Sequence, residues 1–247
     1  MRDRRRGSFE IFEEALSILI NSQDPCSEAR LLADAHPEMS VLQHLVRASC
    51  RGSLSALKEF FDNSKALLAR TCAEHLDELG VERVATLSRS SAVINCIRRC
   101  GVSEVIVSES LPGGEGFETA SILREAGLSV LLVRDSLLPW VAVRRGAIGL
   151  VGADRVTRTH LVNKAGTFAL ASAVRTVAVP GLLKLQDAPH GLSEEIVERY
   201  GIRSLESAFD ETPLEKFLCI IFEGLVLRYD EIGRAFGKLD ALLSLNQ

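Results

Sequence analysis

An aspartate directly follows a short apolar run in the middle of the chain. Residues 148–151, Ile-Gly-Leu-Val, have the length and composition of a buried strand, and Gly-Ala-Asp follows at 152–154. Ligands of an open α/β sheet bind outside the carboxyl ends of its strands, where Asp154 would lie. A carboxylate in that position can act as a general acid or base. The alternative is that Asp154 caps a helix or pairs with Arg155 or Lys164.

A group of residues suited to binding an anion comes next in the sequence. Asn163, Lys164, Gly166 and Thr167 precede a segment rich in Ala, Leu and Val, and the pattern predicts a helix over residues 163–176. The N–H groups of a helix N-terminus, beside a lysine and an asparagine, bind phosphate or carboxylate. Residues 147–169 therefore predict an acid on one side of a crevice and an anion clamp on the other.

The elements that must position these residues alternate in type from residue 81 onward. Short apolar runs predict strands at 84–87, 105–107, 130–133, 148–151 and 177–183. Helical patterns fill the intervals at 90–100, 117–126, 136–145 and 163–176. This alternation is typical of βα units, which form a parallel sheet with right-handed crossovers. We predict an α/β domain with a parallel sheet over residues 80–247.

The first third of the chain shows helical spacing throughout. Phe9, Phe12 and Leu16 recur on one helical face, and Ser40 and Gln43 have the spacing of a capping box. We therefore predict a small all-helical N-terminal domain over residues 1–79, packed against the α/β part. Near the other end, residues 192–200 and 230–243 also have helical patterns.

Polar residues follow each predicted strand, and in a parallel sheet they converge on one edge. In chain order they are Ser88, Arg89, Ser90, Ser91, Glu109, Ser110, Asp135, Ser136, Asp154 and Lys184. The serines at 88–91 lead into a predicted helix, so they either hold a phosphate or simply cap that helix. The glycine-rich loop at 112–116 matches no dinucleotide or Walker motif, and its spacing favours a turn. His160 lies between Asp154 and Lys164 and is a further ligand candidate.

Composition narrows the classes of function. Apolar residues make up 47% of the chain and charged residues 25%, as in ordinary globular proteins. The net charge of −4 gives no support for nucleic-acid binding. No apolar run approaches the roughly 20 residues of a membrane helix, and the N-terminus lacks a signal-peptide pattern, so we expect a cytoplasmic protein without membrane contact.

The six cysteines are scattered without a Cys-x-x-Cys pair. In a reducing compartment they are expected to be small buried apolar residues. No histidines cluster with them, so we expect no metal site.

The residues 151–171, VGADRVTRTHLVNKAGTFALA, closely resemble a family signature. The family unites the alpha, beta and delta regulatory subunits of translation initiation factor eIF2B with ribose-1,5-bisphosphate isomerase and methylthioribose-1-phosphate isomerase. Its pattern is Gly-Ala-Asp, a loop, and Val-x-Asn-Lys-x-Gly-Thr. Further matches keep the family's order: Arg-Gly at 6–7, Glu-Ser-Leu-Pro with Glu-Gly and Thr-Ala at 109–120, and Phe-Asp-x-Thr-Pro at 209–213.

The resemblance implies a helical N-terminal domain followed by a Rossmann-like domain. It also implies a homodimer or larger assembly and a translation-factor partner. For the isomerase members it implies aldose–ketose conversion of a C1-phosphorylated sugar by a cysteine and an aspartate, without metal or cofactor. Asp154 matches the catalytic aspartate, and Asn163 with Lys164 matches the phosphate-side pair. Arg6 and Gly7 match the N-terminal phosphate loop.

Two departures from the family pattern bear on whether the protein catalyses isomerisation or only binds a ligand. Ser88 stands where the catalytic cysteine is expected, and a thiol, with a pKa of about 8.5, is a far better acid and nucleophile than a hydroxyl. Leu111 stands where the family has an arginine, which removes about 1.5–3 kcal/mol of charged hydrogen bonding, or a factor of about 10–150 in affinity.

We therefore predict an eIF2B-regulatory-subunit-like protein that binds a sugar phosphate or nucleotide without isomerase turnover. The alternative is an active aldose–ketose isomerase acting on ribose-1,5-bisphosphate or methylthioribose-1-phosphate. The candidate catalytic residues are Asp154 and, at the degenerate cysteine position, Ser88. The candidate phosphate-binding residues are Arg6, Gly7, Arg89, Ser90, Ser91, Glu109, Asn163 and Lys164.

Overall fold

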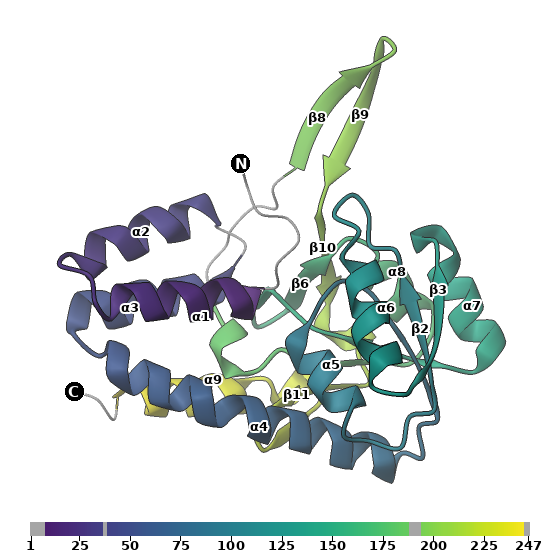
Figure 1. Cartoon of the computed structure of the whole chain (residues 1–247), viewed down its shortest axis with the longest axis horizontal. Coiled ribbons are helices and arrows are strands. Elements are labelled where there is room, and N and C mark those ends of the chain that lie inside the picture. The colour runs from purple at the N-terminus through teal and green to yellow at the C-terminus, as the bar shows by residue number, and fades with distance from the viewer. Residues whose placement is uncertain (1–7, 37–38, 188–193, 245–247) are drawn as a thin grey trace.

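The computed structural model describes residues 8–36, 39–187 and 194–244 (Figure 1). No helix in these ranges is long and apolar enough to cross a membrane. The chain begins with four helices, as the helical spacing predicts: α1 (Ser8–Leu19), α2 (Pro25–Ala35), α3 (Ser40–Arg51) and α4 (Leu54–Glu78). Local signals mark their ends. The Asp24 carboxylate accepts a hydrogen bond from Ser27 N ahead of α2, and Gly52, with φ of +72°, ends α3.

These helices and the sheet share one apolar core. Phe12 of α1 meets Phe61 of α4 edge-to-face, with ring centroids 4.7 Å apart. The same buried cluster includes Leu42 of α3 and reaches Ala85 and Ile106 in the sheet. The helical part is therefore packed against the α/β part, as expected, and is not tethered to it.

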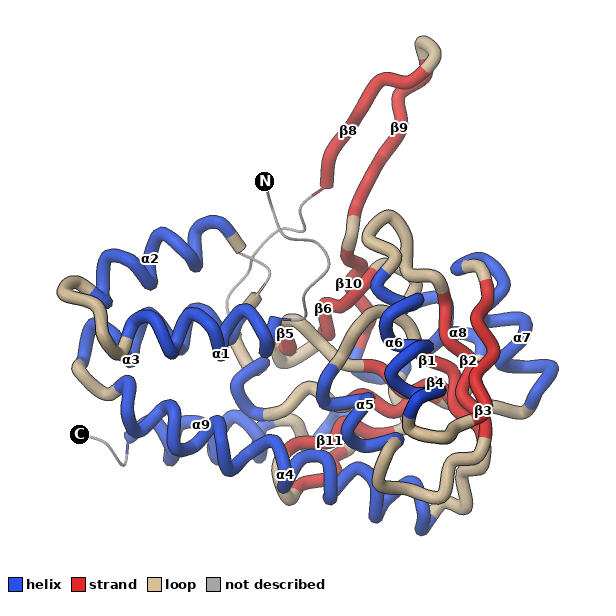
Figure 2. The backbone as a smooth tube through the Cα atoms, in the orientation of Figure 1, coloured by secondary structure: helices blue, strands red, loops and turns tan. Residues whose placement is uncertain are grey.

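The α/β part is built on a seven-stranded sheet in the order β12-β11-β7-β4-β1-β2-β3. Figure 2 labels β11, β4, β1, β2 and β3 of this sheet. Its strands are β1 (Arg83–Thr86), β2 (Glu104–Ser108), β3 (Ser129–Val133), β4 (Ile148–Val151), β7 (Thr176–Ala178), β11 (Cys219–Phe222) and β12 (Leu225–Leu227). All neighbours pair in parallel except β11 and β12. The predicted fold class is confirmed: a Rossmann-like domain with a mostly parallel sheet follows a helical N-terminal region.

The helices of this part are α5 (Ser91–Ile97), α6 (Glu115–Glu125), α7 (Leu138–Arg145), α8 (Thr167–Ala173) and α9 (Gly233–Ser244). Short 3-10 turns η1 (Asp135–Leu137), η2 (Leu182–Lys184), η3 (Leu214–Lys216) and η4 (Tyr229–Glu231) join several elements. The strand order runs outward in both directions from β1 and β4, so the loops after these two strands diverge. Such a reversal is where open α/β sheets form a ligand crevice.

A second, antiparallel sheet overturns part of the sequence prediction. It contains β5 (Arg155–Val156), β6 (His160–Lys164) and β10 (Phe209–Pro213). The predicted helix over 163–176 is wrong at its start, because Asn163 and Lys164 pair with β10 as part of β6. The hydrogen bonds that make this segment a strand come from β10, which is distant in the sequence, so local periodicity cannot predict them. The strand predicted over 177–183 is also shorter, since β7 ends at Ala178.

The predicted helix over 192–200 is wrong as well. This segment forms a hairpin of β8 (Glu194–Arg199) and β9 (Ile202–Ser207), which projects from the rest of the molecule in Figure 1. Tyr200 and Gly201 form the two-residue turn, and both have positive φ, as a type I′ turn requires. The signal available in the sequence was Gly201 between two runs that contain β-branched residues.

Four of the six cysteines form disulfides, which the expectation of small buried apolar residues in a reducing compartment did not include. Cys26 joins Cys50 and Cys72 joins Cys96, which links α2 to α3 and α4 to α5. Each pair is separated by 24 residues, and helix packing brings the Cα atoms to 4.6 and 5.7 Å. In the described ranges, no group of three or more His, Cys, Asp or Glu side chains could hold a metal ion.

His44 of α3 is a buried titratable group that ties this helix to the residue after the η2 turn. Its Nε2 donates to the Leu185 carbonyl at 3.0 Å, and burial lowers the pKa of the imidazole from 6.5 to about 4. Between pH 6.5 and 4 the unfolded chain binds a proton that the folded chain excludes. His44 therefore stabilises the fold above pH 6.5, and this contribution is lost as the pH falls toward 4.

Replacing His44 with Gln, whose Nε2 can donate to the same carbonyl, should flatten this pH dependence. We expect the wild type to lose up to about 3 kcal/mol more unfolding free energy than His44→Gln between pH 6.5 and 4. Urea unfolding at a series of pH values measures the difference. Equal losses in the two proteins would contradict the assignment.

Candidate functional site

Ser88 lies at the carboxyl end of β1 and is held from three sides. Its φ of +67° is a left-handed conformation that a non-glycine residue keeps only when its surroundings enforce it. Its N–H donates to Ser110 Oγ at 2.7 Å, and its carbonyl accepts from Thr119 Oγ1 at 3.0 Å. The Ser88 hydroxyl donates to Glu115 Oε1 at 3.3 Å. Three hydrogen bonds therefore join the loop after β1 to the segment after β2.

Glu115 and Lys164 form a buried ion pair beside Ser88. The Lys164 Nζ lies 2.8 Å from Glu115 Oε1, and both side chains are at most 6% exposed. Glu115 is the first residue of α6, where a negative charge is favoured by the helix dipole. Sequence reasoning included Glu115 only as part of a family match, so this partner of Lys164 and Ser88 was missed.

The glycine-rich loop makes this arrangement sterically possible. A Cβ on Gly116 would meet the Ser108 carbonyl oxygen, so only glycine lets α6 begin against the end of β2. Gly114, with φ of +74°, is the N-cap of α6. The loop forms a turn, as its spacing predicts, and it also brings Glu115 into the crevice.

The start of α8 is already occupied by a carboxylate from the chain itself. Asp210 of β10 accepts from Gly166 N at 2.7 Å and from Phe168 N at 3.1 Å. Burial raises the pKa of the Asp210 carboxyl group. The N–H groups that sequence reasoning assigned to an anion therefore bind Asp210. Asn163 contacts the first residue of α8, since its Nδ2 donates to Thr167 Oγ1 at 3.0 Å.

Asp154, which follows β4, lies next to Lys184 of the η2 turn. The Lys184 Nζ lies 4.0 Å from Asp154 Oδ1, with side-chain exposures of 3% and 15%. Burial lowers the pKa of Lys184 to about 8, while the charge of Asp154 acts in the opposite direction. The same Nζ lies 4.1 Å from the centroid of the Phe9 ring, a cation–π contact. The lysine beside Asp154 is thus Lys184, which sequence reasoning named only among the polar residues at strand ends.

The two ion-pair partners proposed for Asp154 from sequence bind elsewhere. Arg155 is buried and lies 3.6 Å from Glu211, while Lys164 pairs with Glu115. Gly152 lets the chain after β4 pass close to the N-cap of α5, because a Cβ there would lie 2.9 Å from the Cβ of Ser90.

The structure places the other candidates around this centre. Ser90 Oγ accepts from Val93 N at 3.4 Å, so Ser90 caps α5, and Ser91 is the first residue of that helix. Arg89 lies 3.3 Å from Glu118 of α6. Glu109 is half-buried, and its N–H donates to the Val133 carbonyl.

His160, at the start of β6, is hydrogen-bonded to the neighbouring Thr159 hydroxyl. Arg6 and Gly7 lie outside the described residues.

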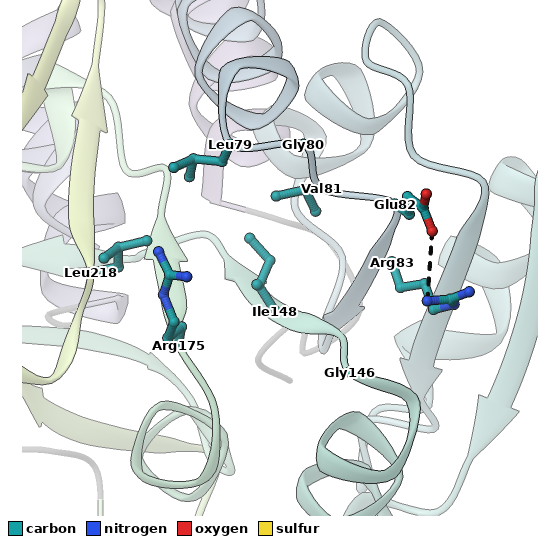
Figure 3. A pocket seen from close by; sticks show the side chains of 9 residues that line it. All are labelled: Leu79, Gly80, Val81, Glu82, Arg83, Gly146, Ile148, Arg175 and Leu218. Carbon is teal, nitrogen blue, oxygen red and sulfur yellow. Dashed lines mark ion pairs between the residues drawn. The ribbon is translucent and has the colours of Figure 1, made fainter.

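A shallow hollow of about 190 Å³ lies at the opposite ends of the central strands (Figure 3). It is lined by Leu79, Gly80, Val81, Glu82, Arg83, Gly146, Ile148, Arg175 and Leu218. Arg83 and Ile148 begin β1 and β4, so the hollow is at the amino ends of the strands. Its lining includes none of Ser88, Glu115, Asp154, Lys164 and Lys184. Because ligands of such sheets bind at the carboxyl ends of the strands, we place the candidate site at these five residues and refer to it as the crevice.

Comparison with known proteins agrees with the resemblance seen in the sequence. The profile described as the Initiation factor 2 subunit family matches residues 26–183. The chain is 34% identical over 181 residues to a translation initiation factor eIF-2B subunit 2-like protein of Pyrococcus abyssi, covering 67% of this chain and 64% of the relative. It is 30% identical over 183 residues to the ribose 1,5-bisphosphate isomerase of Archaeoglobus fulgidus, covering 62% and 58%. The match thus spans less than two thirds of these relatives.

Solved structures share the fold over almost the whole chain. The translation initiation factor eIF-2B of Pyrococcus horikoshii has a TM-score of 0.78 at 24% identity, covering 92% of this chain and 93% of that one. A chain of the tetrameric eIF2B-beta2-delta2 complex of C. thermophilum has a TM-score of 0.65 at 14% identity, covering 96% of both. Similar structures therefore include subunits of oligomeric complexes.

Removing the Lys164 ammonium should leave Glu115 buried without its cation. We expect Lys164→Met to lose about 3–5 kcal/mol of unfolding free energy, measured by urea denaturation. The double variant Glu115→Gln/Lys164→Met should be more stable than Lys164→Met alone. Lys58→Met is the matched control, since Lys58 and Asp62 form an exposed pair expected to contribute under about 1 kcal/mol. Equal losses in the two single variants would show that the buried pair does not stabilise the crevice.

Proposed function

We propose that this chain, which belongs to the initiation factor 2 subunit family, binds a phosphorylated sugar or nucleotide in the crevice without interconverting aldose and ketose. The observation that carries the proposal is the environment of Ser88. The family resemblance puts Ser88 where the isomerases have their cysteine, and here its hydroxyl donates to a carboxylate that is already paired with Lys164.

Aldose–ketose conversion needs a group that exchanges a proton at neutral pH. A serine hydroxyl is a much weaker acid than a thiol, and its activation would require a strong neighbouring base. Glu115 is the base within reach, but its charge is matched by Lys164 at 2.8 Å. This pairing favours a Ser88 that keeps its proton and acts as a hydrogen-bonding residue.

The charges of the crevice support phosphate binding. An ammonium has three N–H donors, so Lys164 can keep its bond to Glu115 and still donate to a phosphate oxygen. Lys184 places a second buried cation on the other side, next to Asp154. The two lysines can bind the phosphate of such a ligand, and the carboxylates of Glu115 and Asp154 can accept hydrogen bonds from its hydroxyls.

An isomerase is the alternative function, and one observation favours it. Asp154 keeps the position of the family's catalytic aspartate, and the pKa of Lys184 beside it is lowered to about 8. A lysine with such a pKa exchanges protons near neutral pH and is suited to acid–base catalysis. Assembly into a homodimer and contact with a translation factor are further expectations from the family and stay predictions.

Turnover separates the two functions. Incubation with ribose-1,5-bisphosphate or methylthioribose-1-phosphate, followed by NMR, should give no ketose signal and no exchange of the C2 hydrogen with solvent deuterium. Ketose formation that disappears in Asp154→Asn would establish the isomerase instead.

Binding is measured by calorimetry against a panel of phosphorylated sugars and nucleotides. We expect at least one to bind the wild type, and Lys164→Met to weaken it about 10- to 150-fold through loss of a charged hydrogen bond. Lys58→Met should bind like the wild type. The titrations are run at a temperature where circular dichroism shows each variant folded. If the wild type binds no compound of the panel, the proposed function is wrong.

A further inference from the structure

Ser40, the first residue of α3, is fully buried and bonds to two distant segments of the α/β part. Its hydroxyl lies 3.1 Å from the Asp154 carbonyl and 3.3 Å from the Leu183 carbonyl. Its N–H donates to the Asp154 carbonyl at 3.2 Å. A serine hydroxyl carries one hydrogen, so the two carbonyls share it in a three-centre bond. One side chain thus joins the loop after β4 to the η2 turn.

This use of Ser40 differs from the capping box that its spacing with Gln43 predicts. The N-cap of α3 is Met39, and no side chain caps the helix there. The Ser40 hydroxyl, which could have capped α3, instead hydrogen-bonds to carbonyls of two other segments. Its burial and its partners therefore point to a role in the arrangement of those segments.

The two segments carry the charged residues on one side of the crevice. Asp154 is itself held through its carbonyl, and Lys184 directly follows Leu183. One turn further along α3, His44 donates to the Leu185 carbonyl at 3.0 Å. The carbonyls on both sides of Lys184 are therefore held by α3, by Ser40 before it and by His44 after it.

We propose that Ser40 is a positioning residue that sets the separation of the Asp154 carboxylate and the Lys184 ammonium, and so makes ligand binding in the crevice depend on the packing of α3. The proposal rests on the proposed function for its effect on binding. Its structural part, the separation of the two charges, stands independently of any ligand.

The separation matters because the protonation of Lys184 depends on it. Burial lowers the pKa of Lys184 to about 8, and Asp154 is the charged group that raises it. Two further titratable groups held near the η2 turn, among the residues that the structure describes, are His44, whose pKa burial lowers to about 4, and Glu223, which accepts from Leu182 N. If Asp154 and Lys184 move apart, the attraction weakens and Lys184 loses its proton at a lower pH.

Ser40→Ala tests the proposal in the ligand-free protein. NMR of labelled lysine, with the Lys184 signal assigned by its absence in Lys184→Met, follows the titration of that ammonium. We expect the midpoint to fall by about half a pH unit or more in Ser40→Ala, because loss of the shared hydrogen bond lets the two segments separate. Ser40→Thr keeps the hydroxyl and should restore the wild-type midpoint.

Ser49→Ala is the matched control on the same helix. Ser49 is also buried, and within the described residues its hydroxyl has no hydrogen-bond partner. Its replacement should leave the Lys184 titration unchanged. An unchanged midpoint in Ser40→Ala, or an equal shift in Ser49→Ala, would overturn the positioning role.

The effect on binding is measured by calorimetry with ribose 5-phosphate between pH 6.5 and 9. Affinity should fall as Lys184 loses its proton, with the fall moved to lower pH in Ser40→Ala. At pH 7.5 the affinity of that variant should be about 2- to 12-fold weaker, the size of one neutral hydrogen bond.

The two proposals fail in different ways. If neither ribose 5-phosphate nor the wider panel binds the wild type, the proposed function fails, while the ligand-free titration still decides the role of Ser40. If ribose 5-phosphate binds and its affinity has the same pH profile in Ser40→Ala, the link from α3 to binding is refuted.

Discussion

The buried ion pair between Lys164 and Glu115 is the interaction on which the crevice depends. It joins β6 of the small antiparallel sheet to the start of α6 on the main sheet, and Ser88 donates to the same carboxylate oxygen. Two charges removed from water are tolerated only when each remains close to the other and to further polar groups. The positive φ of Ser88 and the close approach at Gly116 are local costs that this arrangement requires.

A second lysine–carboxylate pair, Lys184 with Asp154, has a different character. Its 4.0 Å separation exceeds a hydrogen bond, and its geometry is set through backbone carbonyls held by Ser40 and His44. The first pair depends on direct contact, whereas the second depends on how α3 packs. Because both lysines face a carboxylate, the crevice has nearly balanced charge. Under the proposed function, this balance of charge favours ligands that offer both an anionic group and hydroxyls over simple anions.

The parts of the fold that local pattern controls were predictable, and those that distant pairing controls were not. Five strands of the main sheet, β1, β2, β3, β4 and β7, follow from apolar runs. The strands β11 and β12 of the same sheet were not predicted, although all four residues of β11 are buried. Asn163 and Lys164 precede a helical pattern, yet their backbone pairs with β10, far away in the sequence. In the site, Asp154, Ser88 and Lys164 were identified through motif and resemblance. Their partners Glu115 and Lys184 emerge only when separate loops are brought together in three dimensions.

The serine at position 88 is consistent with the charges around it. A thiolate there has no hydrogen to donate, so it would lose the hydrogen bond that the Ser88 hydroxyl gives to the Glu115 carboxylate. A neutral hydroxyl keeps this bond, because it donates its hydrogen to the carboxylate and adds to the pair with Lys164. The family resemblance implies a cysteine at this position, whose chemistry needs ionisation, whereas the hydrogen bond that Ser88 makes needs its proton. The same contact that holds the crevice together keeps Ser88 protonated, and this is why we place binding ahead of turnover.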